Sequence, residues 1–168
     1  MPTTIVIGNP KPRSRTAQAA RMLAEALTGT APDITIDVVE LGAPLLGWGD
    51  APVASAVDAV ARSRLVIVAS PTFKATYTGL LKLFLDQFAG GTGMQGVVAV
   101  PLMLGASPAH AMAPDLLLKP VLVELGATCP TPGLYLMEKS FEDGVAIQAF
   151  SDRWSSTVRA LTRRGDES

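Results

Sequence analysis

Short polar and basic side chains gather in one segment near the start of the chain, Asn9-Pro10-Lys11-Pro12-Arg13-Ser14-Arg15-Thr16. The two prolines fix the backbone and remove N–H donors, so the segment is neither strand nor helix interior. Amide, hydroxyl and cationic groups at this spacing are suited to hold an anion. A helical pattern follows directly. Loop N–H groups and the dipole of that helix would both stabilise a phosphate at this point.

Each of these residues also has a purely structural interpretation. Ser14 and Thr16 are of the types that cap helices, and Arg13 and Arg15 could be solvated surface charge. The dipole disfavours cations at a helix start unless an anion is present. That argument favours the phosphate site over the structural interpretation.

Two later segments carry the other candidate residues. The segment Ser70–Tyr77 combines a proline, two aromatic residues and Lys74, and the segment 105–107 reads Gly-Ala-Ser. Small residues there would let the backbone approach a ligand closely. Phe73 and Tyr77 are equally compatible with the core, and Lys74 with a solvated loop tip.

The elements that must position these segments follow from hydrophobic periodicity. We expect strands at Thr3–Gly8, Ile34–Val39, Arg64–Ala69, Gly96–Leu104 and Ala127–Pro132. We expect helices carrying the apolar faces Ala20–Leu27, Val53–Val60, Leu80–Phe88, Pro114–Leu125 and Phe141–Arg164. Pro101 should interrupt the fourth strand, and Pro120 predicts a kink or a tight first turn in the fourth helix.

Strand and helix patterns alternate along the whole chain, which indicates a parallel sheet covered by helices on both faces. The 168 residues suit a single domain over 1–168 with five strands. We therefore expect an α/β three-layer sandwich. The strand order 2-1-3-4-5 is adopted from flavodoxin, a known five-stranded doubly wound sheet, because the sequence does not define it.

In such a sheet, ligands bind at the carboxyl ends of the strands where the winding reverses, between the first and third strands. Segments 9–15, 70–77 and 105–107 follow the first, third and fourth strands, so they should meet at that edge. A ligand with a phosphate at one end and a flat ring at the other would fit there. FMN is such a molecule.

Composition narrows the function classes. The formal net charge of −1 argues against nucleic acid as a partner. No apolar run is long enough to span a membrane, and no secretory signal precedes the first strand, so we expect a cytoplasmic protein.

Cys129 is the only cysteine and should be a small hydrophobe. Spacing assembles no metal cluster, catalytic triad, P-loop or G-x-G-x-x-G motif, and His110 is expected to be a capping or hydrogen-bonding residue.

The residues quoted above resemble the NADPH-dependent FMN reductase family, and most closely the reductases of alkanesulfonate monooxygenase systems. The segment 8–16 carries the resemblance together with Pro71-Thr72-Phe73-Lys74-Ala75-Thr76-Tyr77-Thr78-Gly79-Leu80-Leu81-Lys82. Ala109-His110 and Leu118-Lys119-Pro120-Val121-Leu122 extend it into the fourth helix. Asn9 stands where the family usually has Ser, and Leu116 where some relatives have a polar aromatic residue.

The resemblance implies a flavodoxin-like fold and an enzyme that reduces FMN with NADPH or NADH. It implies phosphate contacts from Asn9, Lys11, Ser14, Arg15 and Thr16. It implies contacts to the ribityl chain and ring from Pro71, Thr72, Phe73 and Lys74, and to the far side of the ring from Gly105, Ala106 and Ser107. No catalytic residue is assigned, because the flavin and the nicotinamide carry the chemistry.

The same resemblance implies a homodimer or homotetramer, and a partner monooxygenase that receives reduced flavin. Three alternatives stay open at this point. The first is a quinone or azo-compound reductase with bound FMN. The second is an electron carrier of flavodoxin type, although such carriers are usually strongly acidic. The third is a flavin-binding protein without turnover.

Overall fold

The computed structural model describes residues 2–163, and within them one parallel sheet forms the centre of the molecule. Its strands are β1 (Thr3–Ile7), β2 (Ile34–Asp37), β3 (Leu65–Pro71), β4 (Val98–Gly105) and β5 (Leu134–Met137). They lie in the order β2-β1-β3-β4-β5 and every neighbouring pair is parallel. The predicted α/β fold and its strand order are therefore confirmed.

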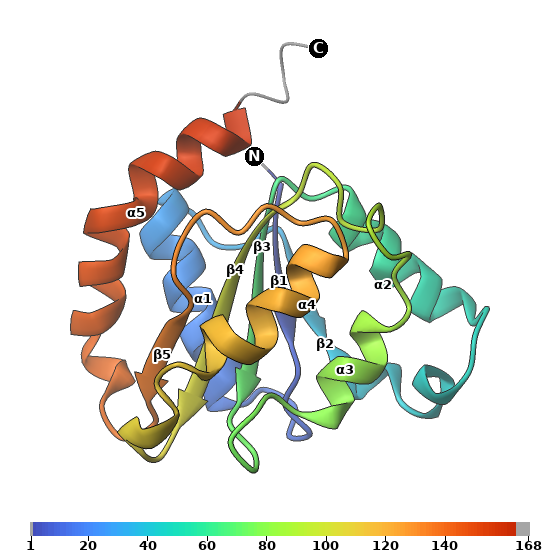
Figure 1. Ribbon diagram of the computed structural model, residues 1–168, viewed down its shortest axis with the longest axis horizontal. Coiled ribbons are helices and arrows are strands. Elements are labelled where there is room, and N and C mark those ends of the chain that lie inside the picture. Colours follow the sequence, from blue (N-terminus) through green and yellow to red (C-terminus); the bar gives the residue numbers. More distant parts are fainter. Residues whose placement is uncertain (1, 164–168) are drawn as a thin grey trace.

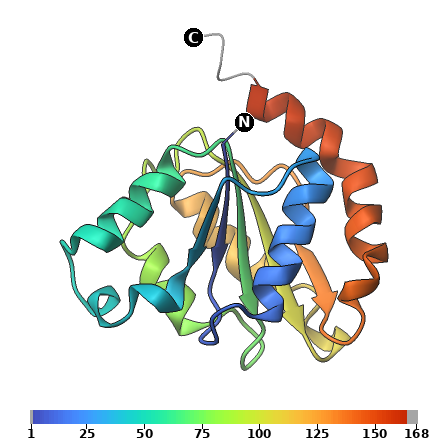
Figure 2. The same cartoon turned by 180° about the vertical axis from the view of Figure 1, so that it is seen from behind.

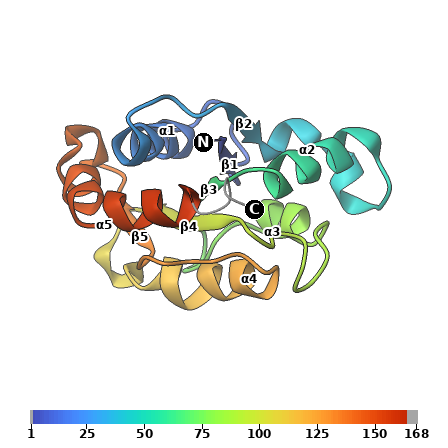
Figure 3. The same cartoon turned by 90° about the horizontal axis from the view of Figure 1, so that it is seen from above.

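Helices cover both faces of this sheet, which gives the three layers seen in Figures 1 and 2. The helices are α1 (Arg15–Thr28), α2 (Ala51–Ala61), α3 (Gly79–Leu85), α4 (Lys119–Glu124) and α5 (Val145–Arg163). Helices α1 and α5 pack on one face, and α2, α3 and α4 on the other (Figure 3). Among the described residues no helix is both long and apolar enough to cross a membrane.

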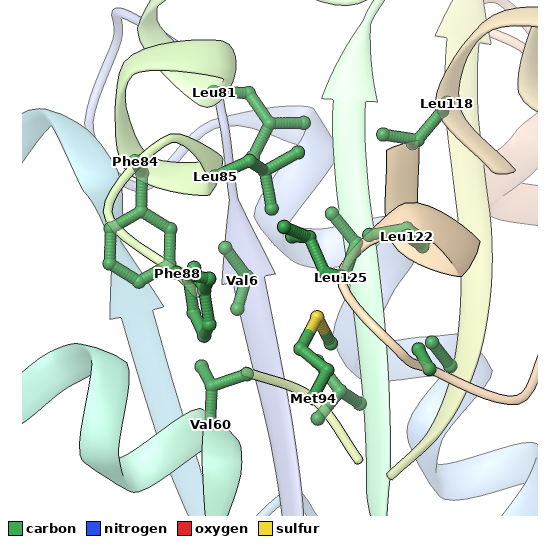
Figure 4. Packing of buried hydrophobic residues seen from close by; sticks show 14 of the residues in the cluster. Val6, Val60, Leu81, Phe84, Leu85, Phe88, Met94, Leu118, Leu122 and Leu125 are labelled. Atoms are coloured by element: carbon green, nitrogen blue, oxygen red, sulfur yellow. The ribbon is translucent and has the colours of Figure 1, made fainter. Parts of the chain in front are cut away.

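Alternation along the strands divides the core between the two faces. Ile5 and Ile7 of β1 pack with α1 and α5, whereas Val6 points to the opposite cluster with α3 and α4. Figure 4 shows this second cluster, in which Phe84 and Phe88 meet edge to face with ring centroids 5.3 Å apart. Because the central strands are buried on both faces, the sheet is a rigid platform for the loops at its ends.

The expected last strand at Ala127–Pro132 is wrong. The strand lies at Leu134–Met137 instead, and Thr128 forms only an isolated bridge to Val98. Pro130 and Pro132 lack N–H donors, so the segment between them cannot continue a ladder. The sheet contact resumes one residue after Gly133, where Leu134 and Leu136 are buried.

Other boundaries differ by a few residues. Strand β2 ends at Asp37, where a 3₁₀ turn over Val38–Leu41 begins, and not at Val39. Strand β3 includes the expected loop residues Ser70 and Pro71. A 3₁₀ turn at Phe141–Asp143 precedes α5, so the last helix begins at Val145 and not at Phe141, and Arg164 lies outside the described residues.

The two prolines singled out in the sequence behave differently. Pro101 does not interrupt β4, which runs unbroken and pairs it with Val68 of β3. Pro120 lies in the first turn of regular α4, and the irregular turn precedes it and is wide, so the tight first turn that was one of the two expectations is not found. The segment Pro114–Leu118 is a π-helical turn in which the Lys119 N–H donates to the Pro114 carbonyl oxygen, and regular α4 starts only after it. A proline removes one N–H of the helical ladder, which is compatible with this wider turn.

Candidate functional site

The loops that follow β1, β3 and β4 all leave the sheet at its carboxyl edge, the lower edge in Figure 1. Strands β1 and β3 are adjacent, and β4 lies beside β3. The three candidate segments of the sequence therefore come together at one edge, as expected. This edge is also where the winding of the sheet reverses, the usual ligand position in open α/β folds.

The first loop is shaped by side chains that fold back on its own backbone. Ser14 is the N-cap of α1, and its hydroxyl oxygen accepts a hydrogen bond of 3.3 Å from the Ala17 N–H. The Asn9 amide donates to the Thr16 hydroxyl oxygen at 3.0 Å, and its own oxygen accepts from the Lys11 N–H at 2.9 Å. The capping interpretation of Ser14 is thus correct, and Thr16 and Asn9 tie the loop to the first turn.

These bonds leave donors available for an anion. The hydroxyls of Ser14 and Thr16 act as acceptors, so each keeps its one proton for a further acceptor. The N–H groups of the first helical residues, Arg15 and Thr16, have no acceptor within the helix. The first turn contains no acidic residue that would oppose an anion. This donor set at the start of α1 fits a phosphate group, and we call residues 9–16 the phosphate cradle.

The three cations of the cradle lie in different surroundings. Lys11 and Arg13 are exposed. The Arg15 guanidinium reaches across to the end of β5, where it forms an ion pair of 3.3 Å with Glu138 and a hydrogen bond of 3.3 Å to the Glu138 carbonyl oxygen. The sequence did not single out Glu138. Arg15 therefore has a protein partner that a phosphate would have to share or replace.

The second loop is a narrow turn at the end of β3. Phe73 and Thr76 exchange backbone hydrogen bonds of 2.8 and 3.2 Å, with Lys74 and Ala75 between them. Both central residues have positive φ, 51° and 71°, a conformation that favours glycine. The turn leaves Phe73 49% exposed, so it is not the core aromatic residue that one interpretation allowed. Tyr77 is half-buried against the core on the α3 side.

A third set of contacts fixes the first two loops to each other. The Thr78 hydroxyl donates to the Gly8 carbonyl oxygen and accepts from the Leu81 N–H, so Thr78 is both the N-cap of α3 and a link to β1. The Ser70 hydroxyl oxygen accepts from the Thr78 N–H at 3.1 Å. A Cβ on Gly8 would lie 2.4 Å from the Cβ of Leu81, so this crossing requires glycine.

The loop after β4 is held from β5. The Tyr135 hydroxyl donates a hydrogen bond of 2.7 Å to the Ser107 carbonyl oxygen. Ala106 and Ser107 are exposed, whereas Gly105 is the buried last residue of β4. Beside Gly105 lies the Thr72 hydroxyl, a buried oxygen without a hydrogen-bond partner in the described part of the chain. An unpaired buried hydroxyl at the meeting of two ligand loops is a candidate ligand contact.

The titratable side chains that bear on the chemistry of the site are a possible metal-binding group, the Cys129 thiol and His110. Within residues 2–163 no group of three or more His, Cys, Asp and Glu side chains could hold a metal ion. Burial raises the pKa of the Cys129 thiol to about 11, so the thiol is neutral and packs against the core as expected. His110 lies in a 3₁₀ turn at Pro108–His110, beside the exposed Met112 and Leu116.

Sequence reasoning missed four residues of this edge: Asp37, Thr78, Tyr135 and Glu138. Asp37 accepts the Arg13 N–H at 3.0 Å and so connects the cradle to the end of β2. Burial raises the pKa of its carboxyl, the Arg13 N–H lowers it, and nearby Glu40 raises it. Thr78 alone of the four lies in a segment that carries the family resemblance, Pro71–Lys82. Tyr135 and Glu138 had no signal, because the last strand was misplaced.

A family model described as "NADPH-dependent FMN reductase" matches residues 1–142. That stretch includes β1 to β5 and therefore all three loops of the candidate site.

Individual proteins agree with the family match. An FMN reductase (NADPH) of Escherichia coli K12 is 47% identical over 62 residues, which is 37% of this chain and 32% of that protein's length. An NADH-dependent FMN reductase, SfnF, of Pseudomonas fluorescens Pf0-1 is 30% identical over 162 residues, 90% of this chain and 82% of that protein. The apo crystal structure of an NADH:FMN oxidoreductase (EmoB) is 29% identical and superposes with a TM-score of 0.81 over 96% of this chain and 88% of that one.

Proposed function

The chain belongs to the NADPH-dependent FMN reductase family, and on this premise we propose that it transfers a hydride from NADPH or NADH to FMN. It is thus an oxidoreductase with a flavin and a nicotinamide as its small-molecule partners. The named relatives differ in the nicotinamide that they use, so both donors belong to the proposal.

The observation that carries the proposal is the donor set of the phosphate cradle. Two hydroxyl protons and two helix N–H groups lie together at the start of α1, whose first turn contains no acidic residue, while the carboxylates of Asp37 and Glu138 contact the Arg13 N–H and the Arg15 side chain. FMN has a phosphate at one end, which such a group of donors would bind. Ser14 and Thr16 would hold the phosphate with the loop N–H groups, and the exposed Lys11 would add a mobile positive charge.

The ring of FMN would lie toward the loops after β3 and β4. FMN, when bound, supplies the ring that accepts the hydride. The chain itself supplies position: Thr72 offers its unpaired hydroxyl and Phe73 an exposed aromatic face. Gly105 would contribute only backbone, because the Tyr135 hydroxyl occupies the place of a side chain there. Because orientation of two reactants removes a large part of a barrier, these contacts are sufficient without a protein acid or base. Pro71, Lys74, Ala106 and Ser107 complete the proposed binding site.

Titration of the purified protein with FMN, followed by NADPH or NADH, tests this function. We expect FMN to bind and each turnover to consume one nicotinamide with FMN as acceptor. A quinone or an azo dye offered at equal concentration should turn over more slowly than FMN. Failure to oxidise either nicotinamide in the presence of FMN would reject the proposal, and a faster quinone rate would favour the quinone reductase alternative.

We further propose that the chain forms a homo-oligomer through the π-helical turn before α4. Met112, Leu116 and Leu117 are 58%, 64% and 41% exposed, and with Ala75 and His110 they line an apolar cavity of about 190 Å³. Apolar residues grouped on a surface indicate a contact with another protein. A second copy is the proposed occupant, and a monooxygenase that accepts reduced flavin is a separate, transient partner. Light scattering of the chain and of Leu116→Glu tests the oligomer, which the charge should dissociate.

A further inference from the structure

A second cavity opens directly beside the phosphate cradle, on the side away from the proposed flavin ring. It has a volume of about 290 Å³, close to the lower end of ligand pockets. Its lining includes Arg13, Ser14, Gln18, Arg21, Asp37 and Glu40. These residues come from the cradle, from the first turns of α1, and from the end of β2 and the turn that follows it.

The strand order shows whether FMN bound in the cradle could also fill this cavity. The edge strand β2 lies on one side of β1, and β3 and β4 lie on the other. A flavin with its phosphate in the cradle and its ring above β3 and β4 would not enter a cavity on the β2 side. FMN alone therefore leaves the cavity unexplained, although Arg13 and Ser14 line both sites.

The charges in the cavity are arranged for a ligand with both acceptors and donors. Within residues 2–163 the guanidinium groups of Arg13 and Arg21 form no ion pair, and both residues are exposed. They can bind a phosphate in the fork geometry that arginine provides. The carboxylates of Asp37 and Glu40, which accept hydrogen bonds only, line the same cavity.

Asp37 supplies the most specific observation. Its Oδ2 accepts the Arg13 N–H at 3.0 Å, while its Oδ1 is buried without a partner in the described part of the chain. A carboxylate at the end of the strand beside β1 is also where dinucleotide-binding folds hold the hydroxyl of a ribose. Because Oδ1 has almost no exposed surface, a sugar hydroxyl would reach this carboxylate after a rotation of the Asp37 side chain.

The backbone of Arg13 indicates that the tertiary structure imposes this arrangement. Its φ of 50° is in the left-handed region, which a residue with a side chain rarely adopts. The hydrogen bond to Asp37 holds it there. Strained backbone that persists through such a contact is common at ligand sites.

We propose that this cavity binds the adenylate half of a dinucleotide, with Asp37 holding the ribose and Arg13 and Arg21 holding a phosphate. The inference rests on the proposed function, because it places the flavin phosphate in the adjoining cradle. Flavin and nicotinamide dinucleotides both carry this group. In FAD the adenylate would continue from the phosphate in the cradle, and in NADPH or NADH it would come from the hydride donor.

Arg21→Ala tests the proposal, with Asp37→Asn as a second variant that keeps an oxygen for the Arg13 N–H. Dissociation constants for FMN and FAD, and KM values for NADPH and NADH with FMN as acceptor, are measured for each. Arg62→Ala is the matched control, an exposed arginine at the C-cap of α2 that does not line the cavity. Melting temperatures verify that every variant folds.

If FAD is the source, the ratio of the FAD to the FMN dissociation constant should rise about tenfold in both variants, as for one lost charge-assisted hydrogen bond. If the nicotinamide is the source, its KM should rise by a similar factor while that ratio stays constant. Either result would support an adenylate-binding site in this cavity. Unchanged FAD ratios and KM values in variants that bind FMN would overturn this inference alone. Absence of FMN binding to the unaltered chain would overturn the proposed function, and this inference with it.

Discussion

The Tyr135 hydroxyl on β5 donates a hydrogen bond of 2.7 Å to the Ser107 carbonyl oxygen in the loop after β4. The same oxygen of Tyr135 would lie 1.9 Å from a Cβ placed on Gly105. The tyrosine therefore fills the space that the glycine leaves free and fixes the loop from outside. Tyr135 is therefore a positioning residue for this loop.

Tyr135→Phe should release Ser107 with little change in packing. We expect a loss of about 1 kcal/mol in the free energy of unfolding, the usual contribution of one hydrogen bond. If the loop contacts the flavin, the FMN dissociation constant should also rise several-fold. Chemical denaturation and flavin titration measure the two effects. A loss of stability with unchanged affinity would mean that residues 105–107 do not contact FMN.

Ser14→Ala removes both a helix cap and a proposed phosphate donor. Loss of the cap should cost about 1 kcal/mol of stability, and loss of the donor should weaken FMN binding about tenfold. Asp50→Ala is a matched control, because Asp50 caps α2 through the Val53 N–H at 3.1 Å and lies outside the cradle. The control should lose similar stability and bind FMN normally. Equal FMN affinity in both variants would place the phosphate elsewhere.

The ion pair between Arg15 and Glu138 predicts a competition for the arginine. Both side chains are partly exposed, so Glu138→Gln should change stability little. If Arg15 contacts the phosphate, removing the carboxylate should tighten FMN binding several-fold, and Arg15→Ala should weaken it. Asp86→Asn, which removes the partner of Lys82 on α3, should leave FMN affinity unchanged. Tighter binding that persists in the double variant Glu138→Gln/Arg15→Ala would contradict the competition.

The turn between Phe73 and Thr76 predicts a stabilising substitution. Ala75 has φ 71°, where a Cβ is disfavoured by about 1 kcal/mol or more. Ala75→Gly should therefore raise the free energy of unfolding by up to about 1 kcal/mol. Ala54→Gly, at an exposed position inside α2, should lower it by a similar amount. Thermal melts of the two variants measure this opposite pair of shifts, and a destabilised Ala75→Gly would contradict it.

Much of the fold could be predicted because local signals agreed. Apolar runs such as Leu65–Ala69 indicate strands buried on both faces, and they recur between helical patterns. The last strand escaped prediction because Leu134–Met137 is only four residues long and follows directly on Pro130, Pro132 and Gly133, residue types that interrupt strands. Such a strand is defined by its pairing with β4, a contact between distant residues.

In the candidate site, too, the contacts between residues near in sequence could be predicted, and those between distant residues could not. The cap at Ser14 depends on residues three apart, so the sequence could predict it. Asp37, Tyr135 and Glu138 act on residues 24, 28 and 123 positions away, and nothing local indicates those contacts. The predicted flavin contacts of the individual residues stay predictions, whereas their placement at one edge is confirmed.

Cys129 predicts a pH dependence of both reactivity and stability. Burial raises the pKa of its thiol to about 11, nearby Lys119 lowers it, and Asp115 raises it. The folded pKa is above the unfolded value of about 8.5. The stability contribution of the neutral thiol is therefore fully present below pH of about 8.5 and is lost as the pH rises toward the folded pKa.

The thiolate is the reactive form, so alkylation of the folded protein at a pH of about 8 should be on the order of a hundredfold slower than that of the denatured chain. Iodoacetamide labelling followed by mass spectrometry measures both rates on the same single cysteine. The folded rate should keep increasing with pH beyond the point where the denatured rate levels off. Cys129→Ala should flatten the alkaline loss of stability, since no thiol then titrates. Equal labelling rates in the two states would show that Cys129 is open to solvent and that its pKa is not raised.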